Sequence, residues 1–120
     1  MTEQKTYHGS CHCGAVSYEA KSAPIDKAMS CNCSMCARKG TLLAFIPASD
    51  FTLKSGADAL TDYQFNKHVL HHVFCRTCGV TSFVRGATPD GREMIALNVR
   101  CLDEVDPDTL AISRFDGKSV

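Results

Sequence analysis

Seven of the eight cysteines in this chain fall into three short clusters. The clusters are Cys11-His12-Cys13, Cys31-Asn32-Cys33-Ser34-Met35-Cys36 and Cys75-Arg76-Thr77-Cys78. Thiolates that lie far apart in the chain but bind one metal ion restrict the folds that the chain can adopt. Four thiolates close a tetrahedral zinc site, whereas three leave one position open for water or substrate. The cysteine count therefore predicts two zinc ions with different roles.

A glycine follows both the first and the third cluster, as Gly14 and Gly79. Glycine lets the backbone turn tightly after a pair of ligands and brings amide N–H groups towards their sulfurs. This shared pattern predicts that the first and third clusters together form a closed, structural zinc site. Its ligands would be Cys11, Cys13, Cys75 and Cys78.

The middle cluster then remains as the candidate open site, with Cys31, Cys33 and Cys36 as ligands. Cys31 and Cys33 can project from the same side of an extended segment, because side chains two residues apart share a face. Cys36 would come from the following turn, at the start of a short helix.

Other residues could also complete this second site. The candidates are Cys101, His8, His12, His68, His71 and His72. Adjacent residues of a strand point to opposite faces, so we expect one of His71 and His72 to be packed and the other solvated. We expect His12 to be exposed and Cys101 to be a half-buried thiol, since Cys101 has no partner at metal-ligand spacing.

Composition restricts the class of protein. A chain of 120 residues predicts one domain over residues 1–120. With 13 basic and 13 acidic side chains the formal charge is zero, which argues against a nucleic-acid partner. The first residues lack the apolar core of a signal peptide, and no apolar stretch is long enough to cross a bilayer, so we expect a cytoplasmic protein without a membrane partner. Cysteines in that compartment favour metal binding over the alternative of a disulfide framework.

Short runs of β-type residues, separated by turn residues, predict a mainly β fold of antiparallel strands. The predicted strands cover residues 15–20, 42–46, 51–53, 60–65, 69–74, 80–84 and 94–99. One or two short helical turns are expected, over residues 36–39 and 107–110.

Together, the clusters resemble the glutathione-dependent formaldehyde-activating enzyme family, whose domain is shared with centromere protein V. The matching segments are Gly9-Ser10-Cys11-His12-Cys13-Gly14-Ala15-Val16, Cys31-Asn32-Cys33-Ser34-Met35-Cys36, Phe74-Cys75-Arg76-Thr77-Cys78-Gly79-Val80 and Asn98-Val99-Arg100-Cys101-Leu102-Asp103. They occur in the order of the family and span most of the chain.

The resemblance implies an Mss4-like fold of short antiparallel strands that zinc holds together. It also implies a structural zinc on the four paired cysteines and a catalytic-type zinc on Cys31, Cys33 and Cys36. Because three protein ligands hold an ion less firmly than four, we expect the second zinc to be the more labile. The implied activity is that of a carbon–sulfur lyase resembling S-hydroxymethylglutathione synthase, in which glutathione or a similar small thiol adds to formaldehyde or a related electrophile. The alternative is a non-catalytic zinc-binding scaffold or interaction module, because a shared domain does not dictate a shared function.

Three thiolates overcompensate the charge of a zinc ion, so the open site would deliver a substrate thiolate rather than polarise a carbonyl. Glutathione carries two carboxylates, and a basic side chain near the site would bind one of them. The candidates are Arg38, Lys39, Lys67, Arg76 and Arg100, with Arg38 and Arg100 the first choices. Each of them is otherwise expected to be a solvated surface charge.

Overall fold

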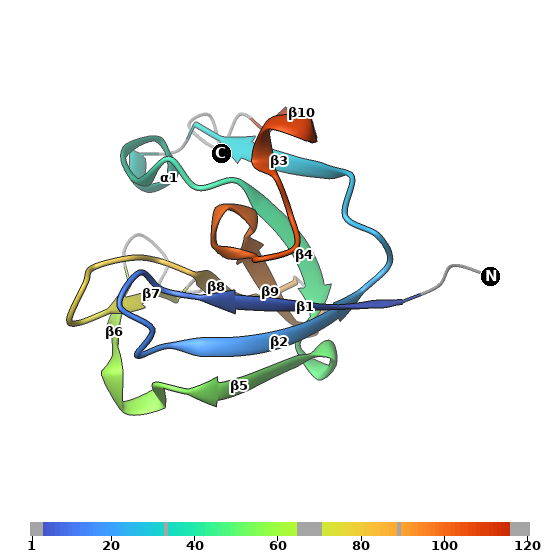
Figure 1. Cartoon of the computed structure of the whole chain (residues 1–120). Helices are drawn as coiled ribbons and strands as arrows, with labels where there is room; N and C mark the ends of the chain where they lie inside the picture. Colours follow the sequence, from blue (N-terminus) through green and yellow to red (C-terminus); the bar gives the residue numbers. More distant parts are fainter. Residues whose placement is uncertain (1–3, 33, 65–70, 89, 116–120) are drawn as a thin grey trace.

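The structure is a computed structural model that describes residues 4–32, 34–64, 71–88 and 90–115. Strands dominate these residues (Figure 1). They are β1 (Lys5–Ser10), β2 (Ser17–Ser22), β3 (Lys27–Cys31), β4 (Leu43–Pro47), β5 (Phe51–Ser55), β6 (Leu60–Tyr63), β7 (His72–Cys75), β8 (Phe83–Ala87), β9 (Glu93–Asn98) and β10 (Ala111–Phe115). The helical elements are α1 (Ser34–Lys39) and the 3-10 turns η1 (Ala48–Asp50), η2 (Ala57–Ala59), η3 (Val99–Cys101) and η4 (Pro107–Thr109).

The mainly β fold predicted from the sequence is therefore confirmed. A strand overlaps each predicted run, and α1 and η4 stand where helical turns were expected. The parts of the predicted strands that fall on residues 65–70 lie outside the described residues. Three further strands, β1, β3 and β10, were not predicted.

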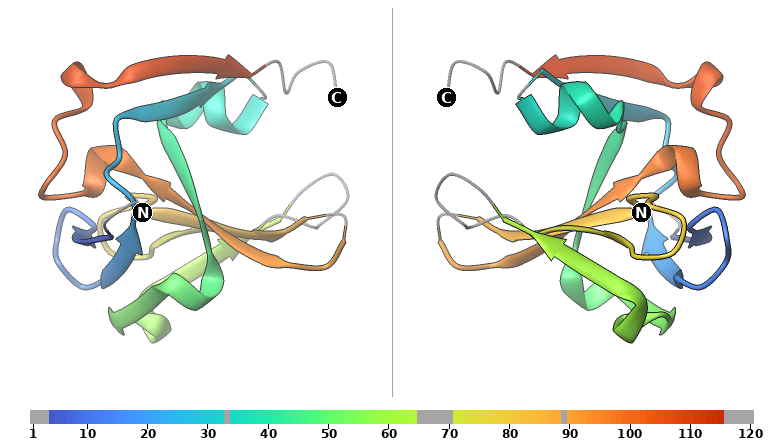
Figure 2. Two further views of the ribbon diagram at one scale, coloured as in Figure 1. Left: turned by 90° about the vertical axis from the view of Figure 1, so that its right-hand side faces the viewer. Right: turned by 90° about the vertical axis from the view of Figure 1, so that its left-hand side faces the viewer.

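The strands form three sheets. β1, β2 and β5 form one, β6 and β7 pair with each other, and a five-stranded sheet has the order β10-β3-β4-β9-β8. The pairs are antiparallel except that of β10 with β3, which is parallel, with Ile112 opposite Ala28. Figure 2 shows β3, β10 and α1 together at one end of the molecule, with β4 running from them towards the other end.

Two apolar clusters cover opposite faces of the five-stranded sheet, because neighbouring side chains of a strand alternate. Phe83 and Ile95 point to the large core, a side that we call the core face. Val84 and Ala96 point to the other side, which we call the helix face, where they form a small cluster with Cys36 of α1.

Aromatic side chains fill the centre of the large core. The ring of Tyr18 lies 4.9 Å from that of Phe51 and 5.6 Å from that of Phe83, measured between centroids. The phenolic O–H of Tyr18 donates to the carbonyl oxygen of Ser82 at 2.8 Å, so this buried hydroxyl is satisfied. The contact joins the β1-β2-β5 sheet to the segment that leads into β8.

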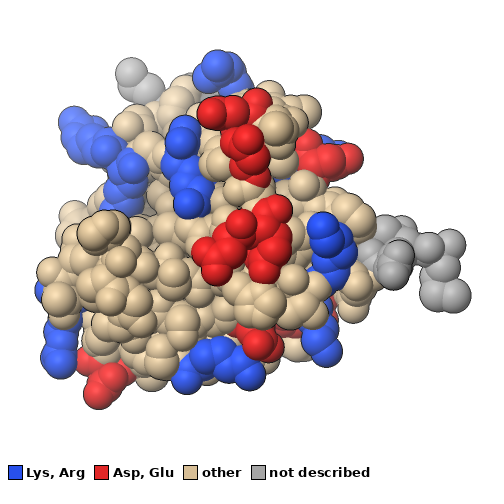
Figure 3. All heavy atoms as spheres, viewed as in Figure 1, with Lys and Arg blue, Asp and Glu red and all other residues tan. Residues whose placement is uncertain are grey.

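Charges of both signs are visible on the surface in Figure 3, with acidic side chains gathered near the middle of that face. Within the part of the chain that the structure describes, no helix is long and apolar enough to cross a membrane.

Candidate metal centre

The first cysteine cluster forms the tight turn between β1 and β2. The amide of Cys11 donates to the carbonyl of Val16 at 3.0 Å, and the amide of Gly14 donates to the carbonyl of Cys11 at 3.3 Å. Gly14 has a φ of 83°, in the left-handed region that favours glycine. The turn closes the hairpin and directs both thiols to one side.

The third cluster forms a similar turn between β7 and β8. The amide of Cys75 donates to the carbonyl of Val80 at 3.0 Å, and the amide of Gly79 donates to the carbonyl of Cys75 at 2.8 Å. Gly79 has a φ of 81°, close to that of Gly14. The glycine that follows each cluster therefore has the turning role that the sequence predicts.

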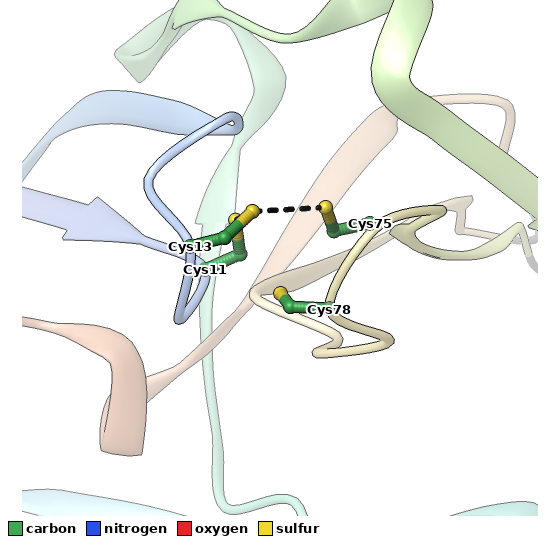
Figure 4. Close-up of side chains that lie close together, drawn as sticks. All are labelled: Cys11, Cys13, Cys75 and Cys78. Atoms are coloured by element: carbon green, nitrogen blue, oxygen red, sulfur yellow. Dashed lines mark hydrogen bonds between the residues drawn. The ribbon is translucent and has the colours of Figure 1, made fainter.

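The two turns face each other, and their sulfurs converge (Figure 4). The Sγ atoms of Cys11, Cys13, Cys75 and Cys78 all lie within 4.8 Å of one another. Cys13 Sγ is 3.7 Å from Cys11 Sγ and 3.6 Å from Cys75 Sγ. Four sulfurs bound to one zinc at about 2.3 Å lie about 3.8 Å from one another. The four thiols thus have the spacing and chemistry to hold a metal ion such as zinc.

The backbone prepares some of these thiols to ionise. The amide N–H of Cys13, together with that of Val80, lowers the pKa of Cys78 to about 6. The amides of Cys78 and Thr77 likewise lower the pKa of Cys75. The amide of Ala15 acts in the same direction on Cys13, but the sulfur of Cys75 and other neighbours outweigh it and raise the pKa of Cys13 to about 11. Metal binding at neutral pH would therefore release protons from this cluster.

The described cysteines of the middle cluster, Cys31 and Cys36, lie elsewhere, on the helix face. Cys31 ends β3 and is half-buried, and Cys36 is buried in α1. Both belong to the small apolar cluster with Leu43 and Val84. Cys33, the third predicted ligand, lies outside the described residues. The three-cysteine metal site therefore stays a prediction.

His12, His71 and His72 take the positions expected from the sequence. His12 is exposed in the first cysteine turn. His72 is buried, whereas the neighbouring His71 is partly exposed and its Nδ1 lies 2.7 Å from a carboxylate oxygen of Asp62. The Nδ1 atom of His8 contacts Glu104. His68 lies outside the described residues.

Cys101 is a half-buried thiol, as expected, and its Sγ lies 3.8 Å from the carbonyl oxygen of Thr81. Burial raises its pKa to about 11. Cys101 and the four clustered cysteines are free thiols, so for these residues the structure does not support the disulfide alternative.

Of the predicted basic candidates that the structure describes, Lys39 alone is partly buried. Its Nζ donates a short hydrogen bond to the hydroxyl of Thr81 and lies 5.2 Å from the centre of the Phe74 ring. Burial lowers the pKa of Lys39, against the opposing effect of Cys36. Arg38, Arg76 and Arg100 are exposed, and Lys67 lies outside the described residues. The sequence signal for Lys39 was its position three residues after Cys36, on the same side of a helix.

Two clefts open on opposite sides of the five-stranded sheet. The larger, of about 510 Å³, lies on the core face and is lined by Phe51, Phe83 and Arg85 among others. The smaller, of about 270 Å³, lies beside α1 and is lined by Lys39 and Thr81 among others. The smaller cleft includes Lys39, which ends the helix that carries Cys36, so it is the better candidate for a substrate.

Comparison with known proteins agrees with this arrangement. The crystal structure of a Rhodobacter sphaeroides protein is similar to this chain, with a TM-score of 0.76 and 34% sequence identity. The match covers 88% of this chain and 99% of that one. The family model described as "Glutathione-dependent formaldehyde-activating enzyme" matches residues 6–114, a range that includes all three cysteine clusters. The chain therefore belongs to the glutathione-dependent formaldehyde-activating enzyme family.

Proposed function

We propose that this chain is a carbon–sulfur lyase-type enzyme that joins a thiol, glutathione or a similar one, to formaldehyde or a related electrophile. Family membership supports the reaction class. The observation that carries the proposal is the separation of the cysteines into two sets. Four sulfurs converge between the cysteine turns, whereas Cys31 and Cys36 lie together in a different cluster on the helix face. Cys31 and Cys36 thus belong to a second set of thiols, distinct from the four-cysteine centre.

Cys31 and Cys36, with Cys33, would hold the second zinc ion. Thiolates are the soft ligands that zinc takes readily without redox chemistry. Bound there, zinc would supply a position at which a substrate thiol loses its proton near neutral pH. The small apolar cluster around Cys36 limits water on one side, while the partly exposed Cys31 leaves the other side accessible.

The reaction forms one carbon–sulfur bond. The thiol S–H gives up its proton, the sulfur attacks the carbonyl carbon of formaldehyde, and the carbonyl oxygen takes up a proton to become a hydroxyl. No oxidant or reductant is needed, which suits a redox-inert metal.

Metal analysis tests the two-site arrangement. We expect the purified wild type to contain two zinc ions per chain and Cys33→Ser to contain one, with the melting temperature little changed. Cys101→Ser is the matched control, because Cys101 belongs to neither set, and it should keep both ions. A single tightly held zinc in all three proteins would favour the scaffold alternative.

Activity is then measured as adduct formation from glutathione and formaldehyde above the spontaneous rate. The zinc-loaded wild type and Cys101→Ser should both accelerate the reaction, and Cys33→Ser should not. If two zinc ions are present and a range of thiols shows no acceleration, the lyase assignment is wrong.

A further inference from the structure

Polar side chains line the smaller cleft, and none of the four clustered cysteines is among its lining residues. It lies on the helix face, between the end of α1 and the second cysteine turn, and measures about 270 Å³. Its lining residues are Lys39, Thr41, Gly79, Val80, Thr81 and Asn98. Ligand pockets commonly start at about 300 Å³, so this cleft suits one arm of a small molecule rather than a whole one.

Lys39 gives this cleft its charge. Among the described residues that line it, Lys39 alone has an ionisable side chain. Thr41 and Thr81 are buried and bring hydroxyl groups, and the hydroxyl of Thr81 accepts a hydrogen bond from Nζ of Lys39. The same ammonium also makes a cation–π contact with the Phe74 ring. A positioned ammonium that has further N–H groups to donate, beside hydroxyls, is a site for a single negative charge.

The amide of Asn98 stabilises the wall rather than the ligand. Its Nδ2 donates to the carbonyl oxygen of Thr81 at 2.8 Å, and its Oδ1 accepts from the amide of Arg100 at 3.3 Å. The first contact fixes the segment that carries Thr81, and the second orients the Asn98 amide. The charge and the hydroxyl that face an anion are thus held in place before it binds.

The cleft is also close to the proposed reaction site. Lys39 follows Cys36 by three residues in α1, and side chains at that spacing lie on one side of a helix with Cβ atoms about 5–6 Å apart. A ligand with its sulfur at the middle cysteine cluster can therefore place a carboxylate at Lys39 when a few bonds separate the two groups.

We propose that the Lys39 cleft binds a carboxylate of the substrate thiol, so that the enzyme selects thiols of the amino-acid or peptide type over simple alkyl thiols. This inference rests on the proposed function for the position of the sulfur. One ammonium and neutral hydroxyls match a monoanion in charge, which favours a carboxylate over a dianionic phosphate.

Calorimetric titration with S-methylglutathione tests the cleft without the reaction, because a methylated sulfur has no proton to lose. We expect Lys39→Gln to weaken binding about tenfold or more, as the loss of a charged hydrogen bond predicts. Lys39→Arg keeps the positive charge and should restore most of the affinity. Lys21→Gln removes an exposed lysine on β2 and is the matched control, with unchanged binding. Equal affinities in wild type and Lys39→Gln would overturn the proposal.

A second measurement needs no variant. The dimethyl ester of S-methylglutathione lacks both carboxylates, and it should bind wild type at least tenfold more weakly than the acid does. Equal binding of acid and ester would also overturn the proposal, even if Lys39→Gln failed to fold.

Kinetics separate this proposal from the function on which it rests. Lys39→Gln should raise KM for glutathione, whereas the control Lys21→Gln should leave it unchanged. If Lys39→Gln weakens the binding of S-methylglutathione but wild type accelerates no thiol addition, the cleft assignment stands and the lyase proposal fails. If wild type is active and Lys39→Gln has an unchanged KM for glutathione, the lyase proposal stands and the cleft assignment fails.

Discussion

At the residue scale, Gly9 shows how a single missing side chain permits the packing of the core. Gly9 of β1 lies opposite Tyr18 of β2. A Cβ atom at position 9 would come within 2.2 Å of the ring carbon Cζ of Tyr18. Tyr18 is buried and tied to Ser82 by its hydroxyl, so its ring cannot easily move aside.

Gly9→Ala should therefore destabilise the protein by about 3 kcal/mol, in the upper range for overpacking a core. Thr6→Ala, on an exposed position of the same strand, should cost less than about 0.5 kcal/mol. Urea unfolding at saturating zinc measures both. Combining Gly9→Ala with Tyr18→Leu should cost less than the sum of the two single changes, because the clash disappears. Similar losses for Gly9→Ala and Thr6→Ala would contradict this explanation.

At the scale of elements, His8 fastens β1 to the segment that follows η3. Its amide donates to one carboxylate oxygen of Glu104 at 2.7 Å, and its ring contacts the other. The hydrogen bond to Glu104 raises the pKa of His8 above its ordinary 6.5, although partial desolvation acts in the other direction. Burial works to raise the pKa of Glu104, but the two contacts from His8 outweigh it and hold that pKa below its usual range.

This pair predicts a pH dependence. Because the pKa of His8 is higher in the folded state, its stabilising effect is complete below about pH 6.5 and is lost as the pH rises through the folded value. His8→Gln and Glu104→Gln should each remove that part of the pH dependence of the melting temperature. The check is a series of melting curves for the three proteins from pH 5.5 to about 8.5, with zinc present. A wild-type profile parallel to those of both variants would show that the pair is without effect.

The elements also show which strands can be predicted from the sequence and which cannot. The apolar run at residues 94–99 predicted β9. Most residues of β9 are buried within the sheet, and buried strands are rich in apolar side chains. β10 is exposed along its whole length and, among the described strands, pairs with β3 alone, so no apolar pattern marks it. Its parallel pairing depends on where the chain returns after η4, which no local pattern encodes.

The same distinction holds at the candidate site. Ligand counting and the two glycines predicted which four cysteines lie together, since both signals are local to each turn. The inward position of Lys39 was not predicted, because it depends on Thr81 and Phe74, which are distant in sequence. Sequence preferred Arg38 and Arg100, and both side chains are exposed.

At the scale of the whole molecule, the four-cysteine cluster connects two turns that are far apart in the sequence. Cys13 and Cys75 are 62 residues apart, and their turns belong to different sheets. A crosslink between such distant residues restricts the unfolded chain strongly.

Removal of zinc should therefore lower the melting temperature by more than about 10 °C, given several kilocalories of metal-linked folding energy. Cys78→Ser should behave like the chelated wild type, because it removes one of the four ligands. Cys101→Ser is the control and should melt near the wild-type temperature when zinc is present. Differential scanning calorimetry with and without a chelator measures these shifts. An unchanged melting temperature after complete zinc removal would exclude a structural role for this centre.

The distance between the two cysteine turns also has a consequence for synthesis of the protein. At about 5–20 residues per second, a ribosome needs about 3–12 seconds to progress from Cys13 to Cys75. The middle cluster is made within that interval, whereas Cys75 and Cys78 of the four-cysteine centre are made only at its end or after it. Until Cys75 and Cys78 have been made, a metal ion that binds the growing chain can contact cysteines of the first two clusters alone, so we expect the four-cysteine centre to form only after that interval.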